Sequence, residues 1–324
     1  MSLCTFDFET RSYADLKKVG SWAYSQDPTT DPICAAWGIG TGEIQTWWPG
    51  KHSETNAIRS DLYVHIASGG IIEAHNVAFE KSIWKNVMMP RYGWPYVPDE
   101  QWRDTMAVAA YLALPLGLDH LAAVLGYQGK HADGGRLISK YCKLYLKTAK
   151  FEIPEEDFAR IVAYCVQDVR IEQSVSDHLG DLPQRELPLF FLHQKMSERG
   201  LYLDREGIEA ASAVVEKRSE DLTNEFRSIT GLNPTQRDKC LDWFRSEGIE
   251  LEDMTADSIE EALEEFWLPQ GPPRRALEIR LAINKASTKK LDAMARQRSE
   301  DGRARFQTRY HGAVTGRETG TGFQ

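Results

Sequence analysis

The sequence predicts a mixed α/β domain over residues 1–182, followed by a mostly helical region over residues 183–324. Three observations support this prediction. Short apolar runs typical of strands come first and then alternate with segments of helical spacing, which indicates a layered α/β fold. The segment GDLPQ (180–184) interrupts this pattern, and helical spacing dominates beyond it. A chain of 324 residues is also long enough for two ordinary domains.

In the first part, apolar spacing predicts both strands and helices. The strands are expected at 3–9, 33–39, 43–48 and 69–75. The helices are expected at 53–67, 77–88, 104–113, 118–126 and 153–179. The last of these segments opens with Pro154 and two glutamates, which are favourable residues for the first turn of a helix.

The second part is predicted to consist of helices joined by short polar loops. The helices are expected at 185–199, 205–229, 235–246, 255–267 and 273–298. The segments GLNP, EGIELED and PQGPP are the expected loops between them.

The composition is that of a soluble globular protein, with 42% hydrophobic and 27% charged residues. The five cysteines are scattered and form no CxxC pair, which argues against a disulfide framework or a zinc site. No apolar run approaches the roughly 20 residues of a membrane span. The first residues, MSLCTFDFET, lack the pattern of a signal peptide. We therefore expect a cytoplasmic protein without a membrane partner.

Charge is distributed unevenly along the chain. The net charge is −9, but residues 271–324 hold twelve Lys and Arg against five Asp and Glu, a balance of +7. This leaves −16 for residues 1–270. The basic end can attract a phosphate backbone, whereas the acidic part would repel one unless divalent metal lies between them.

Two acidic residues, Asp7 and Glu9, stand two positions apart on the first predicted strand. Strand alternation places both side chains on one face. Burying unpaired carboxylates is costly, and a bound cation removes that cost. The alternative is an edge strand with a solvated acidic face, and this segment by itself does not decide between them.

Two later segments supply further candidates. The segment HNVAFE (75–80) follows a predicted strand and opens a helix, with Asn76 as a favourable N-cap and Glu80 about one turn in. On the long helix 153–179, Tyr164 and Asp168 are spaced i, i+4 and therefore share a face. Asp104 is most simply a helix N-cap. Each of these patterns is weak when taken alone.

In this order, DxE, NxxFE and YxxxD resemble the three motifs of the DEDD exonuclease superfamily. Tyr164 marks the DEDDy branch, which includes the proofreading domains of family A and family B DNA polymerases. The resemblance covers residues 3–177 and implies a ribonuclease-H-like fold, a mixed sheet flanked by helices. The second motif usually ends in Asp, whereas this chain has Glu80, which is one methylene longer and keeps the charge.

The resemblance also implies a role for each residue. Asp7, Glu9 and Asp168 would ligate two divalent ions, Mg²⁺ or Mn²⁺, with Glu80 helping to hold the second. Such a pair of ions activates a water and stabilises the departing 3′ oxygen. Tyr164 would orient that water rather than act as a strong base.

The strand–helix junction of the second motif is expected to contact the DNA, through Asn76 and Phe79. Phe79 can stack on the terminal base. Packing in the protein core is the alternative for this side chain.

The second part resembles the entry into the polymerase domain of family A enzymes. The segment RRALEIRLAINKASTKKLDAM (274–294) looks like the thumb, and TGR (315–317) resembles a palm motif of bacteriophage polymerases. The thumb-like helix carries Lys285, Lys289 and Lys290, which either contact the phosphates of duplex DNA or form a solvated face. Arg317 is expected to reach the primer strand.

These resemblances predict a metal-dependent 3′→5′ exonuclease acting on DNA 3′ ends, the proofreading part of a split or truncated family A polymerase. The catalytic palm motifs and the fingers would then lie elsewhere, for example on a second chain, and residues 1–324 alone are not expected to polymerise. Single-stranded 3′ ends and primer-template DNA are the expected partners. The alternatives are a DEDDy exoribonuclease and a non-catalytic DNA-binding or assembly subunit, for which Glu80 is the supporting feature.

Overall fold

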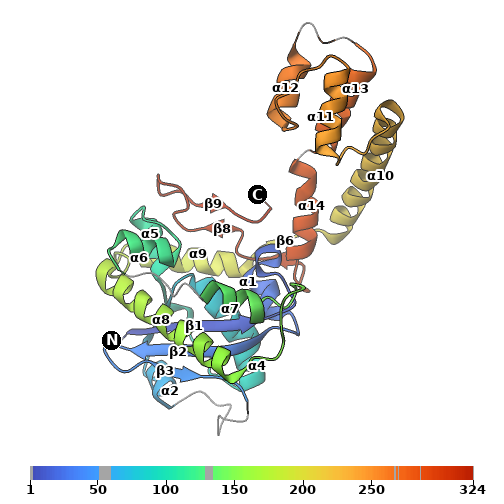
Figure 1. Cartoon of the computed structure of the whole chain (residues 1–324). Helices are drawn as coiled ribbons and strands as arrows, with labels where there is room; N and C mark the ends of the chain where they lie inside the picture. Colours follow the sequence, from blue (N-terminus) through green and yellow to red (C-terminus); the bar gives the residue numbers. More distant parts are fainter. Residues whose placement is uncertain are drawn as a thin grey trace. The chain divides into compact units, whose positions relative to one another are not determined.

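The computed structural model describes residues 3–50, 60–127, 134–265, 268, 270–284 and 286–323. The chain divides into two compact units (Figure 1). The first comprises Met1–Tyr202 together with Arg296–Gln324, and the second comprises Leu203–Ala295. The two compact units do not coincide with the two functional parts that the sequence predicts. The predicted boundary near residue 182 lies inside the first unit.

A mixed sheet forms the centre of the first unit, in the strand order β3-β2-β1-β4-β5. The strands are β1 (Leu3–Arg11), β2 (Asp31–Ile39), β3 (Gln45–Trp47), β4 (Ile71–Ala74) and β5 (Trp102–Asp104). β1 pairs antiparallel with β2 and parallel with β4. The register of β1 against β2 shifts between Glu9 and Thr10, the kind of bulge that re-aims a side chain at a functional site. The expected mixed α/β fold is confirmed.

Strand alternation separates the two faces of this sheet. Phe6 and Phe8 of β1 belong to the largest core cluster, together with Trp37 of β2. The neighbouring β2 residues Cys34 and Ala36 belong to a second cluster on the opposite side. α8 (Glu155–Leu179) packs against β1 and β2 (Figure 1) and contributes to this second cluster. α8 therefore covers the face to which Asp7 and Glu9 point.

The other helices of the first unit surround this sheet. They are α1 (Leu16–Gln26), α2 (Ser60–Ala67), α3 (Val77–Ile83), the π-helix η1 (Trp84–Met88), α4 (Met89–Tyr92), the 3-10 helix η2 (Asp99–Gln101), α5 (Thr105–Tyr111), α6 (Leu118–Val124), α7 (Gly134–Tyr141) and α9 (Leu187–Arg199). The sequence reading missed α1, β5 and α7. α1 is difficult to predict because Gly20 interrupts it with a φ of 80°. Residues 53–59 of the predicted helix 53–67 lie outside the described residues.

The C-terminal residues of the chain return to the first unit. β6 (Leu201–Tyr202) pairs antiparallel with β7 (Arg303–Ala304), so the two chain segments that flank the second unit are joined. β8 (Thr308–Arg309) and β9 (Thr319–Gly320) form a further antiparallel pair. Backbone hydrogen bonds of the first unit therefore join two segments that are about a hundred residues apart in the sequence.

The second unit is helical. It contains α10 (Arg205–Thr230), α11 (Arg237–Ser246), α12 (Ala256–Glu264), α13 (Pro272–Ile283) and most of α14 (Ala286–Gln297). The single helix predicted at 273–298 is wrong, because α13 ends at Ile283. The side chain of Asn284 donates a hydrogen bond to the Arg280 carbonyl, and this competition with the backbone favours a helix end. Within the described residues, no helix is both long and apolar enough to cross a membrane.

Candidate functional site

Three carboxylates from distant parts of the sequence converge beside the central sheet. β1 supplies Asp7 and Glu9, which alternate with the buried Phe6 and Phe8 and are themselves half-buried. α8 supplies Asp168, which is only 5% exposed. Carboxylate oxygens of Asp7, Glu9 and Asp168 all lie within 4.8 Å of one another. The strand and the helix thus bring together residues that are 161 positions apart.

This donor set fits a hard divalent cation. All three side chains offer oxygen ligands, which Mg²⁺ and Mn²⁺ prefer. Three carboxylates this close repel one another, and all three are buried or half-buried on the facing sides of β1 and α8. A bound cation would offset both the repulsion and the loss of solvation.

Glu80 lies outside this group of three carboxylates. It is buried in the first turns of α3, and its Oε2 atom has no hydrogen-bond partner among the described residues. Burial raises the pKa of its carboxyl well above the usual range, and the negative charge of Asp7 raises it further. The role of Glu80 as a metal ligand stays a prediction.

Asn76 occupies the predicted N-cap of α3, but the cap differs from the expected kind. Its backbone is left-handed, with φ 73°, and its side chain makes no capping hydrogen bond. Instead, its backbone N–H donates to Asp104 Oδ1 at 2.9 Å. The same oxygen accepts the N–H of Met106, so Asp104 caps α5 as predicted. Burial raises the pKa of Asp104 to about 6, although these backbone donors oppose the shift.

Phe79 and Tyr164 have identifiable structural neighbours. The Phe79 ring packs against Tyr24 with a centroid distance of 6.0 Å, so core packing accounts for at least part of its contacts. Tyr164 is half-buried on α8, one turn before Asp168. Gly134, at the start of α7, lies directly against the Tyr164 ring: an added Cβ would be 2.1 Å from Tyr164 Cε2. Sequence reasoning missed Gly134, because the signal is purely spatial.

Cys165 is a second residue near the site that sequence reasoning did not single out. Its thiol donates to Asp7 Oδ2 at 3.3 Å. Burial raises the pKa of this thiol well above its usual range, so it stays protonated and remains a donor. Two turns further along α8, the buried Glu172 accepts a hydrogen bond from Thr105 Oγ1 at 3.4 Å. Thr105 Oγ1 also lies 2.9 Å from His75 Nδ1, so hydrogen bonds connect α8 to the end of β4.

The predicted DNA contacts of the second part are only partly described. Lys285 lies outside the described residues. Lys289 and Lys290 are exposed on α14. Arg317 is exposed in the turn between β8 and β9. These positions are compatible with contacts to phosphate, and the DNA-binding roles stay predictions.

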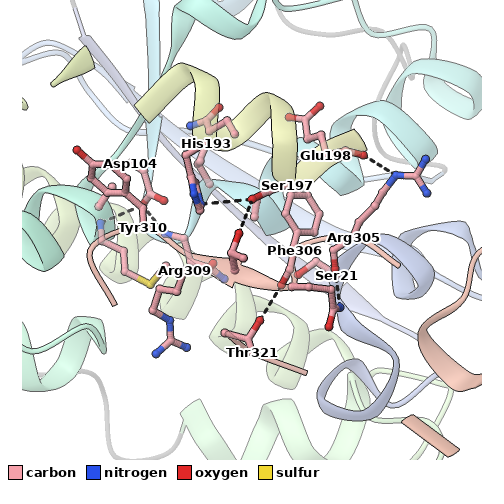
Figure 2. A pocket seen from close by; sticks show the side chains of 18 of the residues that line it. Ser21, Asp104, His193, Ser197, Glu198, Arg305, Phe306, Arg309, Tyr310 and Thr321 are labelled. Carbon is pink, nitrogen blue, oxygen red and sulfur yellow. Dashed lines mark hydrogen bonds between the residues drawn. The ribbon is translucent and has the colours of Figure 1, made fainter. Parts of the chain in front are cut away.

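A cavity of about 500 Å³ lies within the first unit (Figure 2). Its walls come from α1, the start of α3, α5, α9 and the segment that contains β8. His75, Asn76, Val77 and Ala78 contribute to the lining, so the cavity adjoins the helix that carries Glu80. The three clustered carboxylates are not part of its lining.

Comparisons with known proteins place the whole chain beside DNA polymerases. No protein-family model matches the chain. The DNA polymerase of Bacillus phage SP02 is 26% identical over 334 residues, which covers 99% of this chain and 50% of that relative. The POL domain of Pol1 from M. smegmatis, solved in complex with DNA primer-template and dNTP, is similar in fold, with a TM-score of 0.52 and 15% identity.

The second match covers 98% of this chain and 51% of the solved one, so the chain spans about half the length of both proteins. The sequence relationship and the shared fold each extend over nearly all of its residues, including the helical second part. The chain therefore fits a fragment of a family A DNA polymerase.

Proposed function

We propose that this protein is a metal-dependent 3′→5′ exonuclease acting on DNA, the proofreading part of a split or truncated family A polymerase. The observation that carries the proposal is the convergence of Asp7, Glu9 and Asp168 within 4.8 Å. These acids occur in the order and on the elements expected of a DEDDy exonuclease. The relationship to a phage DNA polymerase supports DNA rather than RNA as the substrate.

The proposed roles follow from the position of each side chain. Asp7, Glu9 and Asp168 would hold two Mg²⁺ or Mn²⁺ ions, and Glu80, whose carboxyl pKa is raised by the charge of Asp7, would help to hold the second. When bound, such ions lower the pKa of a water and neutralise charge that develops on phosphate oxygens. Cys165 fixes one oxygen of Asp7. Tyr164, set against Gly134 on the same helix face as Asp168, would orient the attacking water.

The phage relative is about twice as long as the segment that this chain matches. A polymerising activity would require the other half of such a protein. We propose that this half carries the catalytic palm motifs and the fingers and that a second chain can supply it. α9 exposes a stripe of Leu189, Leu192 and Met196, spaced i, i+3 and i+7. A stripe of this kind on a helix is suited to packing against another element.

The exonuclease proposal is tested with 5′-labelled single-stranded DNA in Mg²⁺ or Mn²⁺. The wild-type protein should produce a ladder of shortened strands, and EDTA should abolish it. An Asp7→Ala, Asp168→Ala double variant should lose at least about a thousandfold in rate, since both ligands are gone. The matched RNA strand should be degraded more slowly. Intact DNA binding without any degradation by the wild type would support the assembly subunit instead.

A further inference from the structure

Two buried cysteine thiols adjoin the carboxylate cluster from the protein interior. Cys165 of α8 and Cys34 of β2 are both 0% exposed. The helix and the strand pack against each other, and a side-chain hydrogen bond joins the two thiols. Both residues belong to the core cluster on the side of the sheet that α8 covers. The fold therefore places a pair of uncharged polar groups next to acids that carry formal negative charge.

The Cys165 thiol is directed at Asp7. Its Sγ atom donates to Asp7 Oδ2 at 3.3 Å and lies 3.6 Å from the Asp7 carbonyl oxygen. The thiol has one hydrogen, and the charged carboxylate oxygen is the stronger acceptor of the two. Cys165 therefore holds one oxygen of the Asp7 carboxylate from the buried side.

Cys34 connects this contact to the second acid of β1. It stands opposite Glu9 in the antiparallel register of β1 and β2, and a backbone hydrogen bond joins Glu9 to the Cys34 thiol. Since the hydrogen of Cys165 is committed to Asp7, the hydrogen between the two sulfur atoms comes from Cys34. A continuous chain of hydrogen bonds thus runs from the Glu9 backbone through both thiols to the Asp7 carboxylate. The register of β1 shifts directly after Glu9, at the end of this chain.

A thiol suits this position better than a charged donor would. A lysine or arginine beside Asp7 would neutralise the negative charge that a divalent cation needs. An S–H group is a weak and neutral donor, so it directs the carboxylate and leaves most of the charge available to a metal. An apolar side chain would supply no donor.

We propose that Cys165 is a positioning residue of the metal centre: it holds Asp7 in the orientation that binds the cation, and Cys34 holds Cys165. Removing the hydrogen-bond partner of a metal ligand commonly weakens metal binding or activity by about 10- to 100-fold. The inference rests on the proposed function, because Asp7 is one of the proposed ligands.

The test measures metal binding in the absence of DNA. Mn²⁺ is titrated into metal-free protein, and the unbound ion is followed by electron paramagnetic resonance. Cys165→Ala should weaken Mn²⁺ binding by about tenfold or more. Cys165→Ser should bind Mn²⁺ nearly as tightly as the wild type, because a hydroxyl keeps a donor at this position. Cys34→Ala should have a smaller effect than Cys165→Ala, since Asp7 keeps its direct donor.

Cys142→Ala is the matched control for core packing. Cys142 is a buried thiol of the same core cluster, but the hydrogen bond to Asp7 Oδ2 comes from Cys165. The two alanine variants should therefore show similar decreases in Tm, whereas only Cys165→Ala should lose affinity for Mn²⁺. In the strand-shortening assay, Cys165→Ala should need about tenfold more Mn²⁺ for its half-maximal rate and should approach the wild-type rate at saturating Mn²⁺.

Three outcomes would overturn the inference alone. The first is unchanged Mn²⁺ affinity in Cys165→Ala. The second is an equal loss in Cys142→Ala, which would assign the effect to packing. The third is a loss in Cys165→Ser as large as that in Cys165→Ala, which would show that the donor is not what matters. These results leave the exonuclease proposal intact, since it is judged by strand shortening in Mg²⁺, whereas a wild type that binds no Mn²⁺ would overturn both.

Discussion

Glu73 is a buried acid whose protonation should make the stability of the fold depend on pH. It lies on β4, is 4% exposed, and burial raises its pKa from 4.5 to about 7. The folded protein therefore holds this proton more tightly than the unfolded chain does. As pH rises from about 4.5 to about 7, the unfolded chain releases the proton first, so the free energy of unfolding falls. Above about pH 7 the loss is complete and amounts to roughly 3 kcal/mol.

Glu73→Gln should remove this contribution, because the amide is neutral at every pH. Urea unfolding at pH 5 and pH 8 measures the effect: the wild type should lose more stability between the two than the variant does. Glu250→Gln, at an exposed position, serves as the control and should behave like the wild type. Equal pH dependence in wild type and Glu73→Gln would show that Glu73 is ionised in the folded protein.

Gly134 and Gly135 provide a matched pair for testing the position of Tyr164. A Cβ on Gly134 would be 2.1 Å from the Tyr164 ring, whereas a Cβ on Gly135 meets nothing within 4 Å. Gly134→Ala should displace the ring and lower exonuclease turnover by about tenfold, of the order expected for a misplaced catalytic group. Gly135→Ala should leave turnover unchanged. Equal turnover in both variants would remove Tyr164 from the proposed mechanism.

At the scale of elements, a buried lysine joins α3 to α9. Lys81 is 2% exposed and contacts Asp99 Oδ1 at 3.0 Å, Gln194 Oε1 at 2.9 Å, and Glu198. Asp99 belongs to η2, while Gln194 and Glu198 belong to α9. One ammonium group therefore connects the helix of the second motif to the helix that follows the predicted domain boundary.

Lys81→Ala should destabilise the first unit by about 1–3 kcal/mol, because Glu198 and the buried Gln194 amide lose a hydrogen-bond donor, while Lys85 still pairs with Glu198 and Asp99. Lys140→Ala removes a lysine whose pair with Asp157 is more exposed, and it should change the stability much less. Chemical denaturation of both variants measures the difference. Similar losses in the free energy of unfolding would show that the contacts of Lys81 stabilise the fold no more than an ordinary surface ion pair does.

The elements also show what the sequence can and cannot predict. Alternation in β1 correctly placed Asp7 and Glu9 on one face, and the i, i+4 spacing placed Tyr164 and Asp168 together, because both periodicities are local. The contribution of Gly134 and Cys165 could not be predicted, because their contacts depend on how α7 and α8 pack. The break at Asn284 was missed because apolar spacing continues on both sides of it.

At the scale of the whole molecule, the first unit includes residues from both ends of the chain. Pairing of β6 with β7 returns residues after 296 to the unit that holds the carboxylates, and the predicted functional boundary at 182 lies within this unit. Residues 305–310 line a cavity together with residues of α1, α3, α5 and α9. A segment that resembles the start of a polymerase palm is thus built into the proposed editing unit.

The polarity of digestion is the most direct test of the central claim. One single-stranded DNA is labelled either at its 5′ end or at its 3′ end and incubated with the protein in Mg²⁺. We predict a ladder of decreasing length from the 5′-labelled strand and immediate release of a labelled mononucleotide from the 3′-labelled strand. Internal cleavage, shortening from the 5′ end, or equal activity of the Asp7→Ala, Asp168→Ala variant would contradict the assignment of the carboxylate cluster as a 3′→5′ exonuclease site.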